Sequence, residues 1–298
     1  MISPAANASA YNSKTPGMLT AEVLRRVYAF FRYELIFEVA SAAQLGAAKS
    51  RLLYSDSLSE EERALFTTVS CRAHRNDFLY AIASPEEYLK AGLSAVRCID
   101  QVLAQSDNHN QIRTILDFAC GYGRVARFLR ARFSAADVFV CDIDDAAVDF
   151  CTRAFSAKAI ASNSMFTGLS MGKRFDLIWC GSLITHIDEG ATIRLLKLFY
   201  RHLAPGGFCI FTTHGNQAIE RMPVFGLGAV EQNQVLSQFR QSGYGYASYP
   251  GRIDMGISLV SREKMIAITH AAGPWAETAF IDHGWDNLQD VYGFVSRD

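Results

Sequence analysis

The fold is decided by one stretch of the chain, Ile115-Leu116-Asp117-Phe118-Ala119-Cys120-Gly121-Tyr122-Gly123-Arg124-Val125-Ala126. The stretch begins with an apolar run, continues with two glycines and ends in a helical pattern. Gly121 and Gly123 lack a Cβ, so they permit a tight turn and let a ligand approach the backbone closely. The helix that follows presents unpaired N–H groups at its first turn. The stretch therefore predicts a strand, a ligand-binding turn and a helix, which together open a βαβ unit.

Short apolar runs and helical patterns alternate along the chain that follows. This alternation predicts an α/β fold with a mostly parallel, doubly wound sheet and helices on both faces. The last two strands lie close in sequence, with turn chemistry at residues 284–287, so we expect the seven-stranded sheet to end in an antiparallel hairpin. The expected strands are 112–118, 138–141, 158–161, 175–180, 208–213, 277–281 and 290–295, and the expected helices are 123–133, 144–155, 188–203 and 261–272.

Residues 1–107 predict a helical cap in front of a Rossmann-like domain at 108–298. After a frayed tail at 1–17, apolar residues recur at helical spacing from residue 20 to about 45. The charges between them are mixed in sign, which favours packing on protein over a membrane surface. Capping boxes begin further helices at Ser59 and Ser84. A polar run at 106–110 separates the two regions.

Composition excludes several classes of protein. The 298 residues include 29 Lys and Arg against 30 Asp and Glu, so the basic surplus of a nucleic-acid binder is missing. The seven cysteines contain no C-x-x-C pair, and we expect buried free thiols in a reducing cytosol rather than a zinc site or disulfides. We expect no signal peptide and no membrane-spanning helix, and hence a cytoplasmic protein.

Two acidic residues indicate what kind of ligand the glycine turn binds. Asp142 ends the next strand, 19 residues after Gly123, where a carboxylate accepts the hydroxyl protons of a ribose. The alternative role, capping the following helix, suits Asp144 better. Asp117 stands four residues before Gly121 and would repel a pyrophosphate. The pair therefore favours an adenosine ligand that carries a positive charge over a dinucleotide.

These motifs resemble the class I S-adenosylmethionine-dependent methyltransferases over about residues 112–298. The glycine loop with Asp117, the acid Asp142, the strand 175–180 with Gly181-Ser182-Leu183 after it, and the turn 203–207 follow in the family's order. The resemblance implies a transferase that uses S-adenosylmethionine. It implies that Ala119, Cys120 and Gly121 lie along the methionine, and that Tyr122 and Gly123 of the same loop also bind the cofactor. It implies that Ile143 packs on the adenine with Ser162 and Asn163 at its edge, and that Cys180 and Gly181 approach the methionine. Tyr88 either lies on a helix that covers the cofactor or makes only local hydrogen bonds.

An alcohol or phenol acceptor needs a general base to remove its proton. His186 follows the fourth strand and is the first candidate, although a histidine there could instead order the loop. His214 follows the fifth strand and is the second candidate, or a substrate-binding residue. His74 and Asp77 are candidates for substrate recognition, against plain hydrogen bonding within their loop.

The remaining features concern the acceptor. The segment 243–249 predicts a loop whose tyrosines stack on a ring or pack on the N-terminal helices. Asp286 and Gln289 are candidate hydrogen-bonding residues at the hairpin tip. No Asn-Pro-Pro-Tyr follows the fourth strand and no acids show metal spacing, so we expect O-methylation of a small molecule or glycan without a metal. An NAD(P)-dependent oxidoreductase and a non-catalytic S-adenosylmethionine-binding protein remain as alternatives.

Overall fold

A seven-stranded sheet in the order β3-β2-β1-β4-β5-β9-β8 forms the centre of the computed structural model, which describes residues 16–106, 111–252 and 255–297. Strands β1 to β5 pair in parallel, whereas β9 runs antiparallel to both β5 and β8. The predicted sheet and its terminal hairpin are therefore confirmed. The strands are β1 Thr114–Phe118, β2 Asp137–Cys141, β3 Lys158–Ile160, β4 Phe175–Cys180, β5 Leu203–Thr213, β8 Trp275–Trp285 and β9 Gln289–Ser296.

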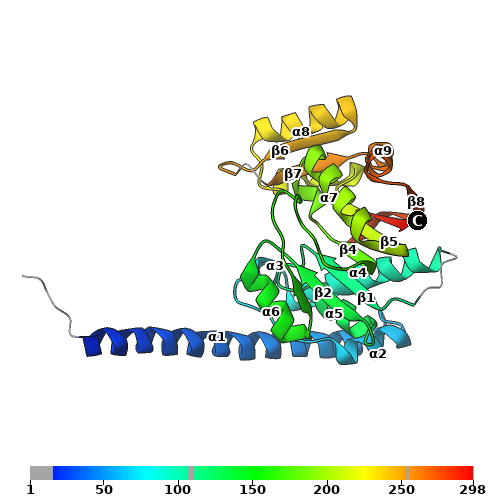
Figure 1. Cartoon of the computed structure of the whole chain (residues 1–298). Helices are drawn as coiled ribbons and strands as arrows, with labels where there is room; N and C mark the ends of the chain where they lie inside the picture. The colour runs from blue at the N-terminus through cyan, green and yellow to red at the C-terminus, as the bar shows by residue number, and fades with distance from the viewer. Residues whose placement is uncertain (1–15, 107–110, 253–254, 298) are drawn as a thin grey trace, which may run out of the picture.

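Helices cover both faces of this sheet (Figure 1). Helices α7 (Glu189–His202) and α9 (Arg262–Ala272) pack on one face. Helices α4 (Pro85–Ala104) and α5 (Ala126–Arg132) pack on the other face, and α6 (Asp145–Phe155) covers the end near β2. Each face buries its own apolar cluster, as expected for a doubly wound sheet. Helix α5 begins at Ala126, three residues later than predicted, because residues 123–125 belong to the glycine turn.

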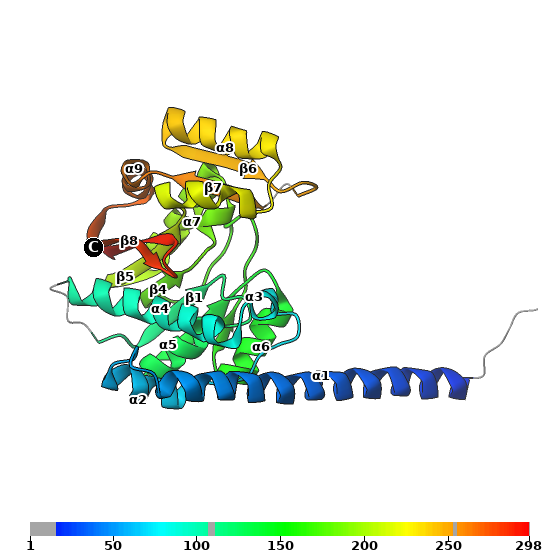
Figure 2. The same ribbon diagram turned by 180° about the vertical axis from the view of Figure 1, so that it is seen from behind.

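The N-terminal helices are α1 (Pro16–Leu53), α2 (Glu60–Thr68) and α3 (Phe78–Ile82). The capping boxes predicted at Ser59 and Ser84 are both present. The C-terminal part of α1 shares an apolar core with α2 and α4, whereas its N-terminal half extends past the rest of the protein (Figures 1 and 2). Among the described residues, no helix is both long and apolar enough to cross a membrane. The expectations for residues 1–15 and 107–110 lie outside the described residues.

An insertion between β5 and α9 departs from the predictions. It contains a 3-10 helix η2 (Asn216–Val224), helix α8 (Ala229–Ser242) and the two-stranded sheet of β6 (Tyr244–Ser248) and β7 (Gly256–Val260). The loop predicted at 243–249 is wrong, because residues 244–248 form β6. Gly245 explains the difference, since a Cβ there would lie 2.0 Å from the carbonyl oxygen of Val235 and hold the strand away from α8.

The carboxyl ends of β1, β2, β4 and β5 meet at one edge of the sheet. Open α/β sheets bind ligands at this edge. The inserted sheet lies beside the same edge, because β7 contacts the 3-10 helix η1 (Ile184–His186) that follows β4.

Candidate active site

The glycine turn after β1 has the geometry of a ligand-binding loop. Ala119, Gly121 and Gly123 have φ values of 61°, 49° and 76°, so the chain reverses sharply. A Cβ on Gly121 would meet no atom within 4 Å, whereas one on Gly123 would lie 2.3 Å from the ring of Phe155. Gly121 therefore faces open space that a ligand can enter, and Gly123 permits close packing against α6.

Asp142 lies at the end of β2, beside this turn. Its Oδ2 accepts a hydrogen bond from the backbone N–H of Gly121 at 2.8 Å, and its Oδ1 accepts one from Asp144 at 3.0 Å. Asp144 in turn caps α6, since its Oδ1 accepts from the backbone N–H of Ala146. This arrangement is consistent with the roles predicted for the two acids, because Asp144 caps α6 and Asp142 lines the pocket.

Asp117 is buried at the end of β1, with 2% of its surface exposed. Its Oδ2 has no hydrogen-bond partner in the structure. Burial, and then the nearby charge of Asp142, raise the pKa of the Asp117 carboxyl to about 8. A ligand with a positive charge beside Asp117 would stabilise the ionised carboxylate. It would offset both the cost of burying that charge and its repulsion by Asp142.

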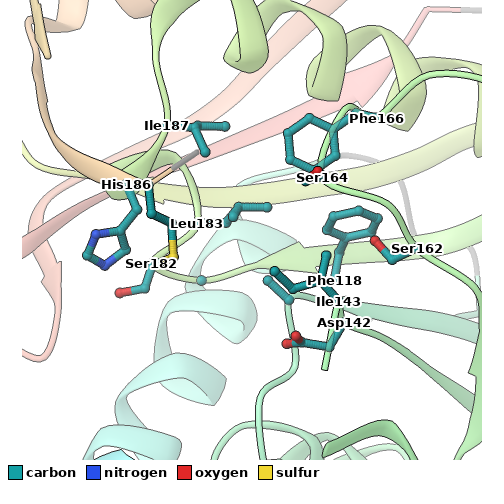
Figure 3. A pocket seen from close by; sticks show the side chains of 13 residues that line it. Phe118, Asp142, Ile143, Ser162, Ser164, Phe166, Ser182, Leu183, His186 and Ile187 are labelled. Carbon is teal, nitrogen blue, oxygen red and sulfur yellow. The ribbon is translucent and has the colours of Figure 1, made fainter. Parts of the chain in front are cut away.

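The pocket at this edge has a volume of about 250 Å³ (Figure 3). Of the predicted site residues, Ala119, Asp142, Ile143, Ser162, Gly181 and His186 line it. In Figure 3, Asp142, Ile143 and Ser162 lie on one side of the pocket, and Ser182 and His186 lie on the other. Residues that the sequence analysis did not select complete the lining: Phe118, Ser164, Phe166, Ser182, Leu183, Ile187 and Met255.

Three other predicted residues have side chains that do not line the pocket. Cys180 is fully buried in the core between the sheet and α7, and Cys120 packs toward α6. The amide of Asn163 donates to Thr167 and accepts from Met165, so it shapes the loop after β3. The side chains of these three residues therefore pack in the core or shape a loop, and none of them lines the pocket.

Tyr88 is fully buried on α4, outside the pocket. Its hydroxyl donates to Asp77 at 2.6 Å and accepts from Arg127 at 3.1 Å. Arg127 also donates to the carbonyl oxygen of Gly123, so Tyr88 supports the glycine loop from behind. Asp77 additionally caps α3 through Tyr80, which matches the hydrogen-bonding alternative for this residue.

His74 and Tyr122 lie over the other side of the glycine loop. Their rings stack with centroids 4.6 Å apart and planes 6° apart. The Tyr122 hydroxyl donates to Asp144 at 2.9 Å. The segment before α3 is thereby joined to both the glycine loop and the start of α6.

His186 is held at the pocket wall by a contact that fixes its tautomer. Its Nδ1 lies 2.8 Å from the carbonyl oxygen of Gly256 on β7, and Tyr249 Oη lies 3.3 Å from the same nitrogen. A carbonyl oxygen only accepts, so Nδ1 carries the proton and Nε2 keeps a free lone pair. Burial lowers the pKa of His186 below its ordinary value of 6.5, so the neutral form persists at neutral pH.

His214 differs from His186 in its surroundings. It is 4% exposed, its ring stacks on Phe225 at 4.6 Å, and it is not among the residues that line the pocket. Burial and the neighbouring His186 lower the pKa of His214 to about 3. A base this weak removes a proton from an alcohol poorly.

A ring of hydrogen bonds behind the pocket was missed by the sequence analysis. The backbone N–H of Ser182 donates to Thr212 Oγ1 at 2.8 Å, Thr212 Oγ1 donates to Gln289 Oε1 at 2.6 Å, and Gln289 Nε2 donates to Ser182 Oγ at 2.6 Å. Ser182 has a φ of 63° and is held there by this ring. Gln289 was selected as a hairpin-tip residue, but its contact with Ser182 spans 107 positions of sequence.

One group of metal-capable side chains occurs among the described residues. Asp282, His283 and Asp290 bring ligand atoms within 4.8 Å of one another, although the sequence shows no metal spacing. Pairing of β8 with β9 joins them. His283 Nδ1 lies 3.2 Å from a carboxylate oxygen of Asp282 and 3.3 Å from one of Asp290, so contacts among the three side chains themselves account for the group.

Residues 115–207 match a family model described as a methyltransferase domain. No curated protein sequence matches the chain. An S-adenosylmethionine-dependent methyltransferase from Clostridium acetobutylicum shares the fold, with 14% identity, 75% of this chain and 96% of that chain covered, and a TM-score of 0.51.

Two further solved structures are similar at lower scores. An amino pentose methyltransferase from Micromonospora echinaspora, solved with S-adenosylmethionine, has 15% identity, coverage of 69% and 91%, and a TM-score of 0.46. Human N-acetylserotonin methyltransferase has 14% identity, coverage of 80% and 57%, and a TM-score of 0.48. The matched family model identifies residues 115–207 as a methyltransferase domain, and the sheet around it has the Rossmann-like fold shared with the S-adenosylmethionine-dependent methyltransferase from Clostridium acetobutylicum.

Proposed function

We propose that this methyltransferase methylates an oxygen atom of a small molecule or glycan, with His186 as the general base. The observation that carries the proposal is the 2.8 Å contact between His186 Nδ1 and the carbonyl oxygen of Gly256. It leaves Nε2 as a proton acceptor on a residue of the pocket wall. His214, buried and with a pKa of about 3, is the weaker candidate.

The residues that would hold the cofactor surround the glycine turn. Asp142 would accept the ribose hydroxyls, and Ile143 and Ser162 would lie along the adenine. The unpartnered Oδ2 of Asp117 fits the positive end of the cofactor, and the open space beside Gly121 admits its backbone. A dinucleotide fits less well, because its pyrophosphate would meet the carboxyl group of Asp117.

S-adenosylmethionine, when bound, supplies a methyl carbon on a sulfonium sulfur, and the sulfur keeps the electron pair of the C–S bond as the new C–O bond forms. His186 Nε2 takes the proton that the acceptor hydroxyl loses. General-base catalysis of this kind contributes roughly a hundredfold to ten-thousandfold in rate. The pocket walls supply position and orientation, the main requirement for a displacement at carbon.

The lining of the pocket supports an acceptor with an apolar or aromatic body. Apolar residues make up more than half of its lining, among them Phe118, Phe166, Leu183, Ile187 and Met255. Met255 comes from the insertion between β5 and α9, so this insertion would contact the acceptor directly. A sugar ring or an aromatic ring presents an apolar face that suits such walls.

The test uses S-adenosylmethionine with a labelled methyl group and the small-molecule fraction of a cell extract. We expect a labelled product whose methyl group is bonded to oxygen, identified by mass spectrometry. His186→Ala should bind the cofactor normally in calorimetry and lose labelling. Labelling that persists in this variant, or a methyl group on nitrogen, would contradict the proposal, and binding without any labelling would favour a non-catalytic binder.

A further inference from the structure

The hydrogen-bond ring of Ser182, Thr212 and Gln289 has a defined direction. The backbone N–H of Ser182 only donates, so Thr212 Oγ1 accepts it. Thr212 is fully buried, and its own hydroxyl proton reaches Gln289 Oε1 at 2.6 Å. Rotating the Gln289 amide by 180° would leave that proton without an acceptor, at a cost of about 1–3 kcal/mol. The amide is therefore oriented with Nε2 toward Ser182.

This direction determines the role of the Ser182 hydroxyl. Ser182 Oγ accepts the hydrogen bond from Gln289 Nε2 at 2.6 Å. Its own proton is not used in the ring, and across the described residues we find no protein atom that accepts it. Ser182 also lines the pocket. Its hydroxyl is thus left as a hydrogen-bond donor for whatever molecule the pocket holds.

The donor and the proposed base belong to one rigid loop. Thr185 Oγ1 donates to the carbonyl oxygen of Ser182. The backbone N–H of His186 donates to the carbonyl oxygen of Leu183 at 2.9 Å. Ser182 and His186 lie on the same side of the pocket in Figure 3. A bound acceptor therefore meets one hydrogen-bond donor and one proton acceptor from the same loop.

A hydroxyl group satisfies both residues and an amine does not. A hydroxyl oxygen has one proton for His186 Nε2 and two lone pairs, one to accept from Ser182 and one to attack the methyl carbon. A neutral amine nitrogen has a single lone pair. If that lone pair accepts from Ser182 it is unavailable for attack, and if it attacks, the Ser182 proton is left unpaired.

We propose that the Ser182 hydroxyl, oriented by Gln289, donates a hydrogen bond to the oxygen that receives the methyl group and so selects hydroxyl over amine acceptors. This inference rests on the proposed O-methyl transfer and adds a specificity residue to it. Ser182 contacts the acceptor, and Gln289 is a positioning residue that acts through Ser182.

The test measures binding rather than turnover, with phenol and aniline as matched probes. The enzyme is saturated with an S-adenosylmethionine analogue in which an ammonium-bearing carbon replaces the methylsulfonium group, so that an N–H occupies the lone pair that would attack the methyl carbon. Each probe is then titrated by NMR at pH 8. We expect wild-type protein to bind phenol at least tenfold more tightly than aniline, as one unpaired buried donor predicts. Ser182→Ala should weaken phenol binding about tenfold and leave aniline within twofold.

Gln289→Glu provides a second variant of nearly identical shape. An ionised carboxylate cannot donate, so the Ser182 hydroxyl should turn its proton toward residue 289 and away from the pocket. We expect the same loss of phenol affinity as in Ser182→Ala, although Ser182 is still present. Affinity for S-adenosylhomocysteine, measured by calorimetry, should stay within twofold in both variants.

Several results would overturn the inference. These are equal affinity of the wild type for the two probes, no phenol binding up to its solubility, equal weakening of both probes by Ser182→Ala, or a parallel loss of S-adenosylhomocysteine affinity. The last result would make Ser182 a cofactor-binding residue. Failure of the proposed function is separate, because it appears as retained methyl transfer in His186→Ala or as methylation of nitrogen.

Discussion

The backbone N–H of Gly121 donates to Asp142 Oδ2 at 2.8 Å, which joins the turn after β1 to the end of β2. This bond holds the glycine loop against the carboxylate proposed to bind the ribose. It gives Asp142 two functions, because the same side chain fixes the loop and faces the pocket.

Replacing Asp142 by Ala is expected to weaken S-adenosylmethionine binding at least tenfold and also to lower the thermal stability of the protein, because the hydrogen bonds from Gly121 and Asp144 are lost. Each hydrogen bond to a charged group contributes about 1.5–3 kcal/mol, and the variant would lose the hydrogen bonds to two ribose hydroxyls. Calorimetric titration measures the loss. Asp145→Ala, which removes an exposed acid three residues further along at the start of α6, is the matched control and should bind normally. Unchanged affinity in Asp142→Ala would remove the ribose assignment.

The two glycines of the loop are expected to respond differently to alanine. Gly123→Ala would place a Cβ 2.3 Å from Phe155, and overpacking of this kind costs about 1–3 kcal/mol in addition to backbone strain. Gly121→Ala adds a methyl group to open space and carries only the strain of its φ, about 1–2 kcal/mol. Denaturant unfolding should therefore rank Gly123→Ala as the less stable variant.

Cofactor affinity should separate the glycines further. Gly121→Ala is expected to lose S-adenosylmethionine binding while remaining folded, because the new methyl group occupies the space left for the ligand. A Gly121→Ala protein that binds the cofactor as tightly as the wild type would show that the ligand passes elsewhere.

Local signals allowed most of the fold and part of the site to be predicted. The alternation of strands and helices, the caps at Ser59, Ser84 and Asp144, and the position of Asp142 all depend on residues close in sequence. Strand β6 was missed because a glycine beside tyrosines is typical of a loop, and only the neighbouring α8 explains Gly245.

Contacts between distant segments could not be predicted. The ring that joins Ser182 to Gln289 depends on the hairpin lying beside the loop after β4, and no spacing in the sequence encodes it. The same holds for Tyr88, whose hydroxyl supports the glycine loop through Arg127 instead of reaching the pocket.

Asp117→Asn is expected to stabilise the free protein while weakening cofactor binding. The pKa of Asp117 near 8 in the folded protein lies above its ordinary value of 3.8, so the folded state holds a proton that the unfolded chain releases. The stabilisation this provides is complete below about pH 4 and is lost as the pH rises through 8. Asn stays uncharged throughout, so its stability advantage over the wild type should widen from pH 5 to pH 9.

Denaturant unfolding at several pH values measures this difference, with the exposed Asp149→Asn as control. At pH 7, a cationic ligand should also displace the proton of Asp117. Calorimetry in buffers of different ionisation enthalpy should then show proton release on S-adenosylmethionine binding in the wild type and none in Asp117→Asn. A gap between the two proteins that narrows with rising pH would contradict the assignment.

The pH dependence of methyl transfer provides the test of His186 itself. A general base acts only when neutral, and burial lowers the pKa of His186 below 6.5. The acid limb of kcat/KM should therefore have its midpoint below pH 6.5, with full activity retained at neutral pH. His186→Gln should reduce the rate by roughly a hundredfold or more and abolish this limb, while S-adenosylhomocysteine still binds. An acid limb that survives the substitution would assign the proton transfer to another group.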